Sequence, residues 1–169
     1  MIKSGTRCLL AAATAGMLSL LWVAPASAAT ITASTTCTNP YAAAQAGPSP
    51  FDIEVPATAT VGTAVTVTVA YAFTNSSGYR VSDANSFSQA IATTGTSQNP
   101  VTVTAGSQGA VPNGSSITVT QSGTWTPDQA GTATFTLGAF SFNTVVLGIT
   151  IPVSCTFDTT PPSVSSVVS

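Results

Sequence analysis

Residues 56–73, PATATVGTAVTVTVAYAF, decide the fold class of this 169-residue chain. After the turn residues Pro56 and Gly62, valines and an aromatic residue alternate with threonine and alanine from Val65 to Tyr71. A period of two places the valines and Tyr71 on one face of a strand and the threonines on the other. The stretch therefore predicts a β-strand with one buried face.

Alternating segments of the same kind recur along the rest of the chain. Residues 39–50 contain three prolines and a glycine and are predicted to form a loop. The weakly patterned stretch 79–98 is expected to hold one irregular strand near 86–93. The other predicted strands are 29–37, 51–55, 100–105, 116–122, 132–137 and 139–155, the last divided near Gly148. About 8–9 short strands with frequent turns predict an all-β fold, an Ig-like antiparallel β-sandwich.

The N-terminus has the three zones of an export signal. Lys3 and Arg7 precede an apolar run at 9–24, and the small residues Ala26-Ser27-Ala28 follow it. We therefore expect a Sec signal peptide at 1–28. The protein is then predicted to be secreted, either extracellular or associated with the cell wall.

The segment after the predicted signal is long enough for one domain with a core. We expect that domain at 29–158, followed by a polar, flexible C-terminal tail at 159–169. No later apolar stretch has the length of a membrane span, so none is predicted.

Two cysteines, Cys37 and Cys155, follow the predicted signal peptide. Two thiols in an oxidising compartment have one possible pairing, so we predict a disulfide between the first and last strands. The bridge would close about 117 residues, which the chain-entropy treatment values at about 4–5 kcal/mol.

Charged residues are scarce. The whole chain has three basic and five acidic residues; without Lys3 and Arg7 the formal charge is one minus five, or −4, and Arg80 is the only cation. One cation cannot neutralise a row of phosphates, which argues against binding to nucleic acid or to an anionic membrane surface. Threonine and serine, 28 and 18 residues after position 28, take the place of charges and suit exposed strand faces.

The composition also argues against an enzyme. The chain has no histidine, and its single lysine lies in the predicted signal peptide. The usual bases that activate a nucleophile are therefore missing. Asp52 and Glu54 share a predicted strand face, and Asp83 with Asn85 resembles a fragment of a calcium loop without its remaining ligands. We interpret these groups as a solvated strand face and an Asx turn, and predict no catalytic residue, cofactor or metal.

Three aromatic residues are candidates for contact with a ligand. Trp125 is the only tryptophan after residue 28. On an exposed edge it would stack on a sugar ring, whereas in a sandwich it usually packs in the core, which is the interpretation we favour. Tyr41 and Tyr79 lie near predicted loops and are the better candidates for a binding face.

Four features together resemble uncharacterised secreted Ig-like domains of actinobacteria. They are the opening Cys37, the unit PATATVGTAVTVTV at 56–69, the unit WTPDQAGTATFTLGAFSF at 125–142, and the closing Cys155. The resemblance implies a bacterial source, an exported Ig-type sandwich with an end-to-end disulfide, and no catalytic residues. It leaves the function open.

Two functions compete. The first is a non-catalytic structural or interaction module of the cell envelope or extracellular space, whose partner is a protein, a cell-wall glycan or a second copy of the chain. Self-association would follow if a run such as VTVTVAYAF lay at a free sheet edge. The second is a carbohydrate-binding module that uses exposed aromatic residues.

Overall fold

The computed structural model describes residues 26–169, so the predicted signal peptide lies outside the described residues except for its last three. None of the described residues forms a helix that is long and apolar enough to cross a membrane. They form ten β-strands: β1 (Ala26–Asn39), β2 (Ala42–Pro56), β3 (Thr58–Ala59), β4 (Val65–Thr74), β5 (Asp83–Gly95), β6 (Val101–Ala105), β7 (Ser116–Trp125), β8 (Gly131–Val146), β9 (Ile149–Phe157) and β10 (Ser163–Val168). The prediction of an all-β chain is confirmed.

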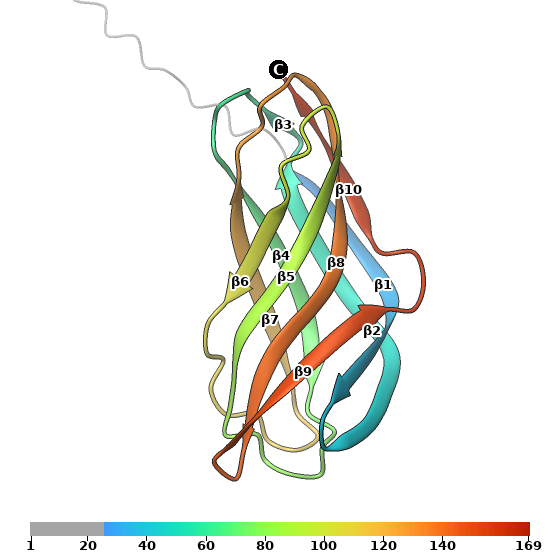
Figure 1. Ribbon diagram of the computed structural model, residues 1–169, viewed down its shortest axis with the longest axis vertical. Helices are drawn as coiled ribbons and strands as arrows, with labels where there is room; N and C mark the ends of the chain where they lie inside the picture. The colour runs from blue at the N-terminus through green and yellow to red at the C-terminus, as the bar shows by residue number, and fades with distance from the viewer. Residues whose placement is uncertain (1–25) are drawn as a thin grey trace, which may run out of the picture.

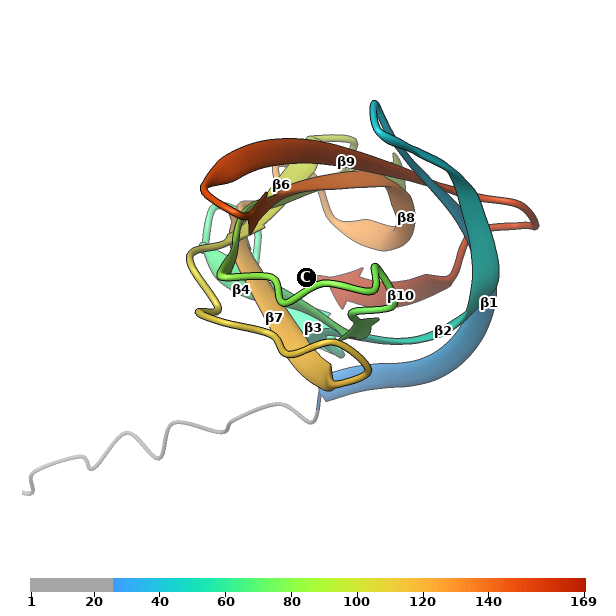
Figure 2. The ribbon, with the colours of Figure 1, turned by 90° about the horizontal axis from the view of Figure 1, so that it is seen from below.

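Eight of these strands close into an antiparallel barrel (Figures 1 and 2). The order around the ring is β8-β5-β6-β7-β4-β2-β1-β9, and β9 also pairs with β8. The ring closes where β9 pairs with β1, and we call this pairing the seam. It is short, because its register pairs involve only residues 35–38 of β1 and residues 154–157 of β9. Because the ring of strands is continuous, it lacks the two edge strands that an open sheet has.

The predicted Ig-like sandwich is therefore wrong: the fold is a closed barrel. Both architectures bury every second residue of each strand, so alternation predicts the strands in either case. The difference lies in β9, which pairs with β8 and β1 at once and so joins what would have been the edges of two sheets. Irregular register in β5, between Asn85 and Ser88 and between Gln89 and Ile91, accompanies the curvature that closure needs.

The C-terminal residues expected as a flexible tail contain strand β10. It pairs antiparallel with the first half of β8, on the edge that β9 uses further along. It also pairs in parallel with β3 through Val167 and Val168. Together the register pairs of β9 and β10 cover that edge of β8 except at residues 137–139.

Side chains that point into the barrel make one continuous core. In the stretch that predicted the fold class, Val67 and Val69 are fully buried and Tyr71 is 4% exposed. β7 pairs with the whole of β4, and β2 pairs with its central residues 68–71, so the middle of this run is not the free edge that self-pairing would need.

A buried glutamine in this core carries an energetic cost. Gln121 is fully buried, and neither its amide nitrogen nor its amide oxygen has a hydrogen-bond partner among the described residues. Methionine has a similar length and no amide to desolvate, so Gln121→Met is expected to raise the free energy of unfolding by about 1–3 kcal/mol. Urea unfolding followed by Trp125 fluorescence measures this change.

The matched control is Gln89→Met. The Gln89 Nε2 donates to the Gly138 carbonyl oxygen at 2.9 Å, so this substitution removes a hydrogen bond and should stabilise less. An equal gain in both variants would contradict the explanation.

Candidate functional site

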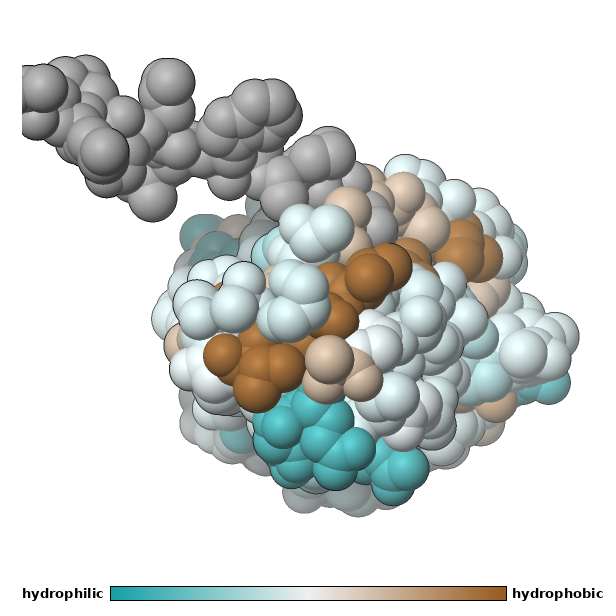
Figure 3. Space-filling view, turned by 90° about the horizontal axis from the view of Figure 1, so that it is seen from above, coloured by the Kyte–Doolittle hydropathy of each residue, from teal (hydrophilic) through white to brown (hydrophobic). Residues whose placement is uncertain are grey.

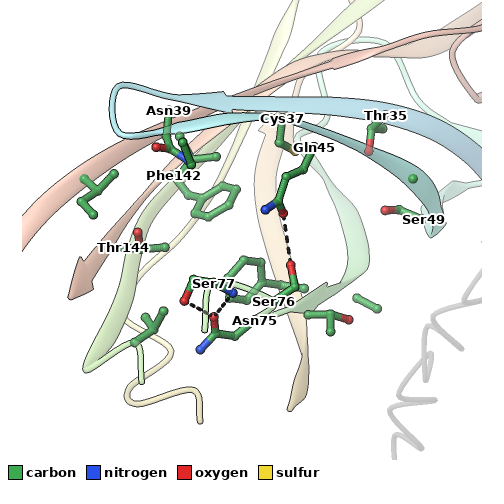
Figure 4. Close-up of a pocket in the computed structure, with 18 of the residues that line it drawn as sticks. Thr35, Cys37, Asn39, Gln45, Ser49, Asn75, Ser76, Ser77, Phe142 and Thr144 are labelled. Atoms are coloured by element: carbon green, nitrogen blue, oxygen red, sulfur yellow. Dashed lines mark hydrogen bonds between the residues drawn. The ribbon is translucent and has the colours of Figure 1, made fainter. Parts of the chain in front are cut away.

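A cavity of about 550 Å³ is lined by residues of the β1–β2 turn and the β4–β5 loop and by residues of β8 and β9. The two connections and the β8–β9 turn lie at the same end of the barrel (Figure 1). Side chains of β1, β2, β4, β8 and β9 form its walls (Figure 4). This volume lies within the range of small-molecule binding sites.

The cavity exists because β2 and β4 separate toward this end of the barrel. They pair only between Phe51–Glu54 and Thr68–Tyr71, although both strands continue beyond these pairs. The next residues of β2 include Pro50 and Pro48, which have no N–H to donate to a neighbouring strand. The wall therefore opens between the two strands, and residues of both line the cavity.

A side-chain hydrogen bond spans this opening. Ser76 Oγ, in the β4–β5 loop, donates to Oε1 of Gln45 on β2 at 3.1 Å (Figure 4). The loop is held in place by Asn75, whose Nδ2 donates to the carbonyl oxygens of Tyr79 at 2.8 Å and Val111 at 2.9 Å. Asn75 Oδ1 accepts two further hydrogen bonds within the loop. The Asn75 amide thus fixes the loop that carries Tyr79.

Aromatic rings form the inner wall of the cavity. Phe73 and Phe142 meet edge to face with centroids 5.2 Å apart, and the rings of Tyr71 and Phe140 lie 5.0 Å apart. The Tyr71 hydroxyl has less than 1 Å² of accessible surface and no hydrogen-bond partner among the described residues. Burial raises the pKa of this phenol well above its ordinary value, so it stays neutral. The cavity therefore meets the Tyr71 ring rather than its hydroxyl.

Two threonines contribute polar groups to the walls (Figure 4). Thr35 and Thr144 are 4% and 8% exposed, and both line the cavity. Gly47 is the register partner of Thr35 on β2, and a Cβ added there would meet no atom within 4 Å. The glycine thus leaves space in front of Thr35.

The cavity is uncharged. None of the residues that line it is acidic or basic, and Arg80 is exposed next to Tyr79 without lining the walls. An uncharged wall suits a neutral ligand and supplies no carboxylate, imidazole or amine for acid–base catalysis. Within residues 26–169, no three His, Cys, Asp or Glu side chains gather into a possible metal site.

The structure brings together two of the three aromatic candidates from the sequence. Tyr41, in the β1–β2 turn, and Tyr79 both line the cavity, and they are 71% and 60% exposed. Trp125 lies apart from them, 2% exposed, with its ring edge to face against Phe135 at 4.8 Å. Only the tyrosines are therefore placed to contact a ligand from solvent.

The predicted disulfide between Cys37 and Cys155 is confirmed. The two cysteines are register partners on β1 and β9, within the short pairing that closes the barrel. Cys37 also lines the cavity, so the bridge belongs to its wall.

Sequence reasoning missed the inner wall and the open space at Gly47. Phe73 continues the alternation of β4 by one inward position, and Phe142 and Thr144 belong to the inward set of β8. That alternation was the available signal. Residues 42–50 were predicted as a loop but form the outer half of β2, where the prolines shape the opening.

The opposite pole of the barrel has a different surface. Figure 3 views it and shows a band of apolar atoms among weakly polar ones. Val61 and Val167 are 41% and 54% exposed, and the Val61 N–H donates to the Ser169 carbonyl oxygen at 2.9 Å. Self-association of the chain stays a prediction.

The fold and the site define a disulfide-bridged β-barrel with an uncharged cavity at one end. No protein-family model matches the chain, and no curated protein is similar to it. Among solved structures it is similar to a crystal structure described as "Putative membrane anchored protein from Corynebacterium diphtheriae", with a TM-score of 0.47 and 17% sequence identity. The similarity covers 83% of this chain and 38% of that chain. This is a weak resemblance to a protein of an actinobacterium.

Proposed function

We propose that the protein is a secreted, non-catalytic interaction module of the cell envelope or extracellular space, and that its cavity binds a neutral carbohydrate. The observation that carries this proposal is the pair of exposed tyrosines, Tyr41 and Tyr79, on the rim of a cavity without charged groups. Tyrosine offers a rigid face with a polar tip, which suits a ring that has both apolar faces and hydroxyls.

The polar groups at the rim support a carbohydrate. Asn39, Gln45 and Ser76 line the outer part of the cavity, and all three side chains are neutral hydrogen-bonding groups. Sugar hydroxyls both donate and accept, so they match such a mixture without a charged partner. The scarcity of charge in the whole chain fits a neutral partner as well.

A protein partner that adds a strand at the opening is less well supported. β2 presents Pro48 and Pro50 along the stretch that has separated from β4, and proline blunts a sheet edge against pairing. Backbone pairing is the main source of affinity in strand addition. The opening is therefore better suited to a ligand held by side chains.

Co-sedimentation with insoluble polysaccharides and with purified cell walls tests the proposal. The protein from Ala29 onward should be retained on at least one of them. Gly47→Leu should lose retention, because its side chain would occupy the open space inside the cavity. Tyr79→Ala should weaken retention by removing one rim ring.

The control is Ala92→Leu, which places the same leucine side chain at an exposed position of β5 away from the cavity. It should be retained like the original protein. Loss of retention in Gly47→Leu with an unchanged circular dichroism spectrum would support the cavity as the site. Retention on no polysaccharide, or equal retention of Gly47→Leu, would contradict it and favour a protein partner.

A further inference from the structure

The cavity has a polar rim and an apolar interior. Most amide and hydroxyl side chains lie toward the opening, whereas the inner residues are aromatic or aliphatic apart from the two buried threonines, Thr35 and Thr144. Of the residues that line it, the apolar inner set comprises Phe73, Val81, Phe140, Phe142 and Val153. The one phenol at this depth is that of Tyr71, whose hydroxyl is buried and whose ring faces the cavity. A sugar ring placed this deep would lose several hydrogen bonds to water and could replace only those that Thr35 and Thr144 offer.

One side of the mouth is apolar too. Val146 and Ile151, near the end of the β8–β9 hairpin, line the cavity, and the hairpin tip carries Leu147 and Ile149, which are 82% and 57% exposed. These four residues form a continuous apolar strip from the cavity wall to the surface, which we call the lip.

The backbone at this tip is unusual. Val146 pairs with Ile149, so Leu147 and Gly148 form a two-residue turn with φ of 51° and 78°. Turns with two positive φ values favour Asn-Gly, and a bulky residue in the first position is strained. An exposed leucine held at an energetic cost beside a cavity mouth points to a contact with an apolar group.

From these observations we infer that the ligand is an amphiphile: a neutral sugar that carries an apolar group. The apolar group fills the interior against Phe73 and Phe142 and passes the lip at Leu147, while the sugar stays at the rim near Tyr41 and Tyr79. This inference rests on the proposed function, because it names which part of the carbohydrate ligand enters the cavity.

A pair of glucosides tests the inference. Octyl β-D-glucopyranoside, below its micelle concentration, and methyl β-D-glucopyranoside differ only in the length of the alkyl chain. Because each buried methylene adds affinity, the octyl compound is expected to bind at least about 100-fold more tightly by isothermal titration calorimetry. Equal affinities of the two glucosides would overturn the inference.

Variants locate the alkyl chain. Gly47→Leu should bring the affinity for the octyl compound down to that for the methyl compound, because it fills the interior. Leu147→Asn should weaken octyl binding at least threefold while keeping the fold, since asparagine suits the turn. Val167→Asn, which removes an exposed apolar side chain at the other pole, is the matched control and should change nothing. An unchanged octyl affinity in Leu147→Asn and Gly47→Leu would also overturn the inference.

The binding of octanol, measured in the same way, tests this inference separately from the proposed function. If octanol binds as tightly as octyl glucoside, the rim does not contact the sugar, and the amphiphile assignment is wrong. Retention on polysaccharides is measured independently. A protein that is retained on a glycan but binds both glucosides equally would keep the proposed function and lose the inference.

Discussion

Removal of the disulfide by the double substitution Cys37→Ala and Cys155→Ala is expected to lower the free energy of unfolding by about 4–5 kcal/mol. The bridge has a sequence separation of 118, so it removes much of the conformational freedom of the unfolded chain. It also lies within the short β1–β9 pairing, which is where the ring of strands closes. Besides the bridge, four register pairs and the hydrogen bonds of the Ser34 and Thr38 side chains to Asp158 and Ser154 hold this seam, and none of them replaces a covalent cross-link.

Urea unfolding followed by Trp125 fluorescence measures this loss. Treatment of the original protein with a reducing agent should shift the midpoint by the same amount as the double substitution. The single variant Cys37→Ala should behave like the double one, because either change removes the cross-link. A loss below about 1 kcal/mol would mean that the strand pairing alone closes the barrel.

Replacement of Trp125 by alanine is expected to lower the free energy of unfolding by about 3–5 kcal/mol. The indole is 2% exposed and packs edge to face on Phe135, so its removal leaves a void in the core. Trp125 pairs with Val65 at the start of β4, whereas the cavity is built on the end of that strand. Thermal unfolding followed by circular dichroism measures the loss.

The conservative variant Trp125→Phe keeps the fold testable if the alanine variant does not fold. It retains most of the apolar contact, and Trp125 Nε1 has no hydrogen-bond partner among the described residues to lose. We expect a much smaller destabilisation and unchanged retention on polysaccharides. Loss of retention in a folded Trp125→Phe protein would instead place this residue in ligand binding.

The sequence predicts the strands of this fold better than their closure. Alternation from Val65 to Tyr71 predicts which side chains face inward, and the structure buries Val67, Val69 and Tyr71. The same alternation belongs to sandwiches and barrels alike. Closure depends on the pairing of β9 with both β8 and β1, and a period of two carries no information about which strands are neighbours.

Prolines that indicate an interruption in the sequence have a second interpretation, which only the pairing of the strands reveals. Pro48 and Pro50 indicate a loop when each proline counts as an interruption. In the structure this stretch is a strand paired on one side with β1, and the prolines belong to a part of β2 that does not pair with β4. Residues 163–168 are similar, because Pro161 and Pro162 suggest a tail although a strand follows them.

The candidate site could be predicted in part. The positions of Tyr41 and Tyr79 near turns indicated surface aromatic residues, and the structure places both at one cavity. Their convergence depends on strands that are distant in sequence. The apolar interior could not be separated from ordinary core, because Phe73 and Phe142 follow the same inward pattern as residues that are completely covered.

Both ends of the described chain lie at the pole opposite the cavity. Ala26 pairs with Pro56, directly before β3, and β3 in turn pairs with the end of β10 (Figure 1). A tether at either end would therefore hold the barrel by one pole and point the mouth outward. On a sensor surface every captured molecule would display the same face, so the number of accessible binding sites should equal the number of molecules attached.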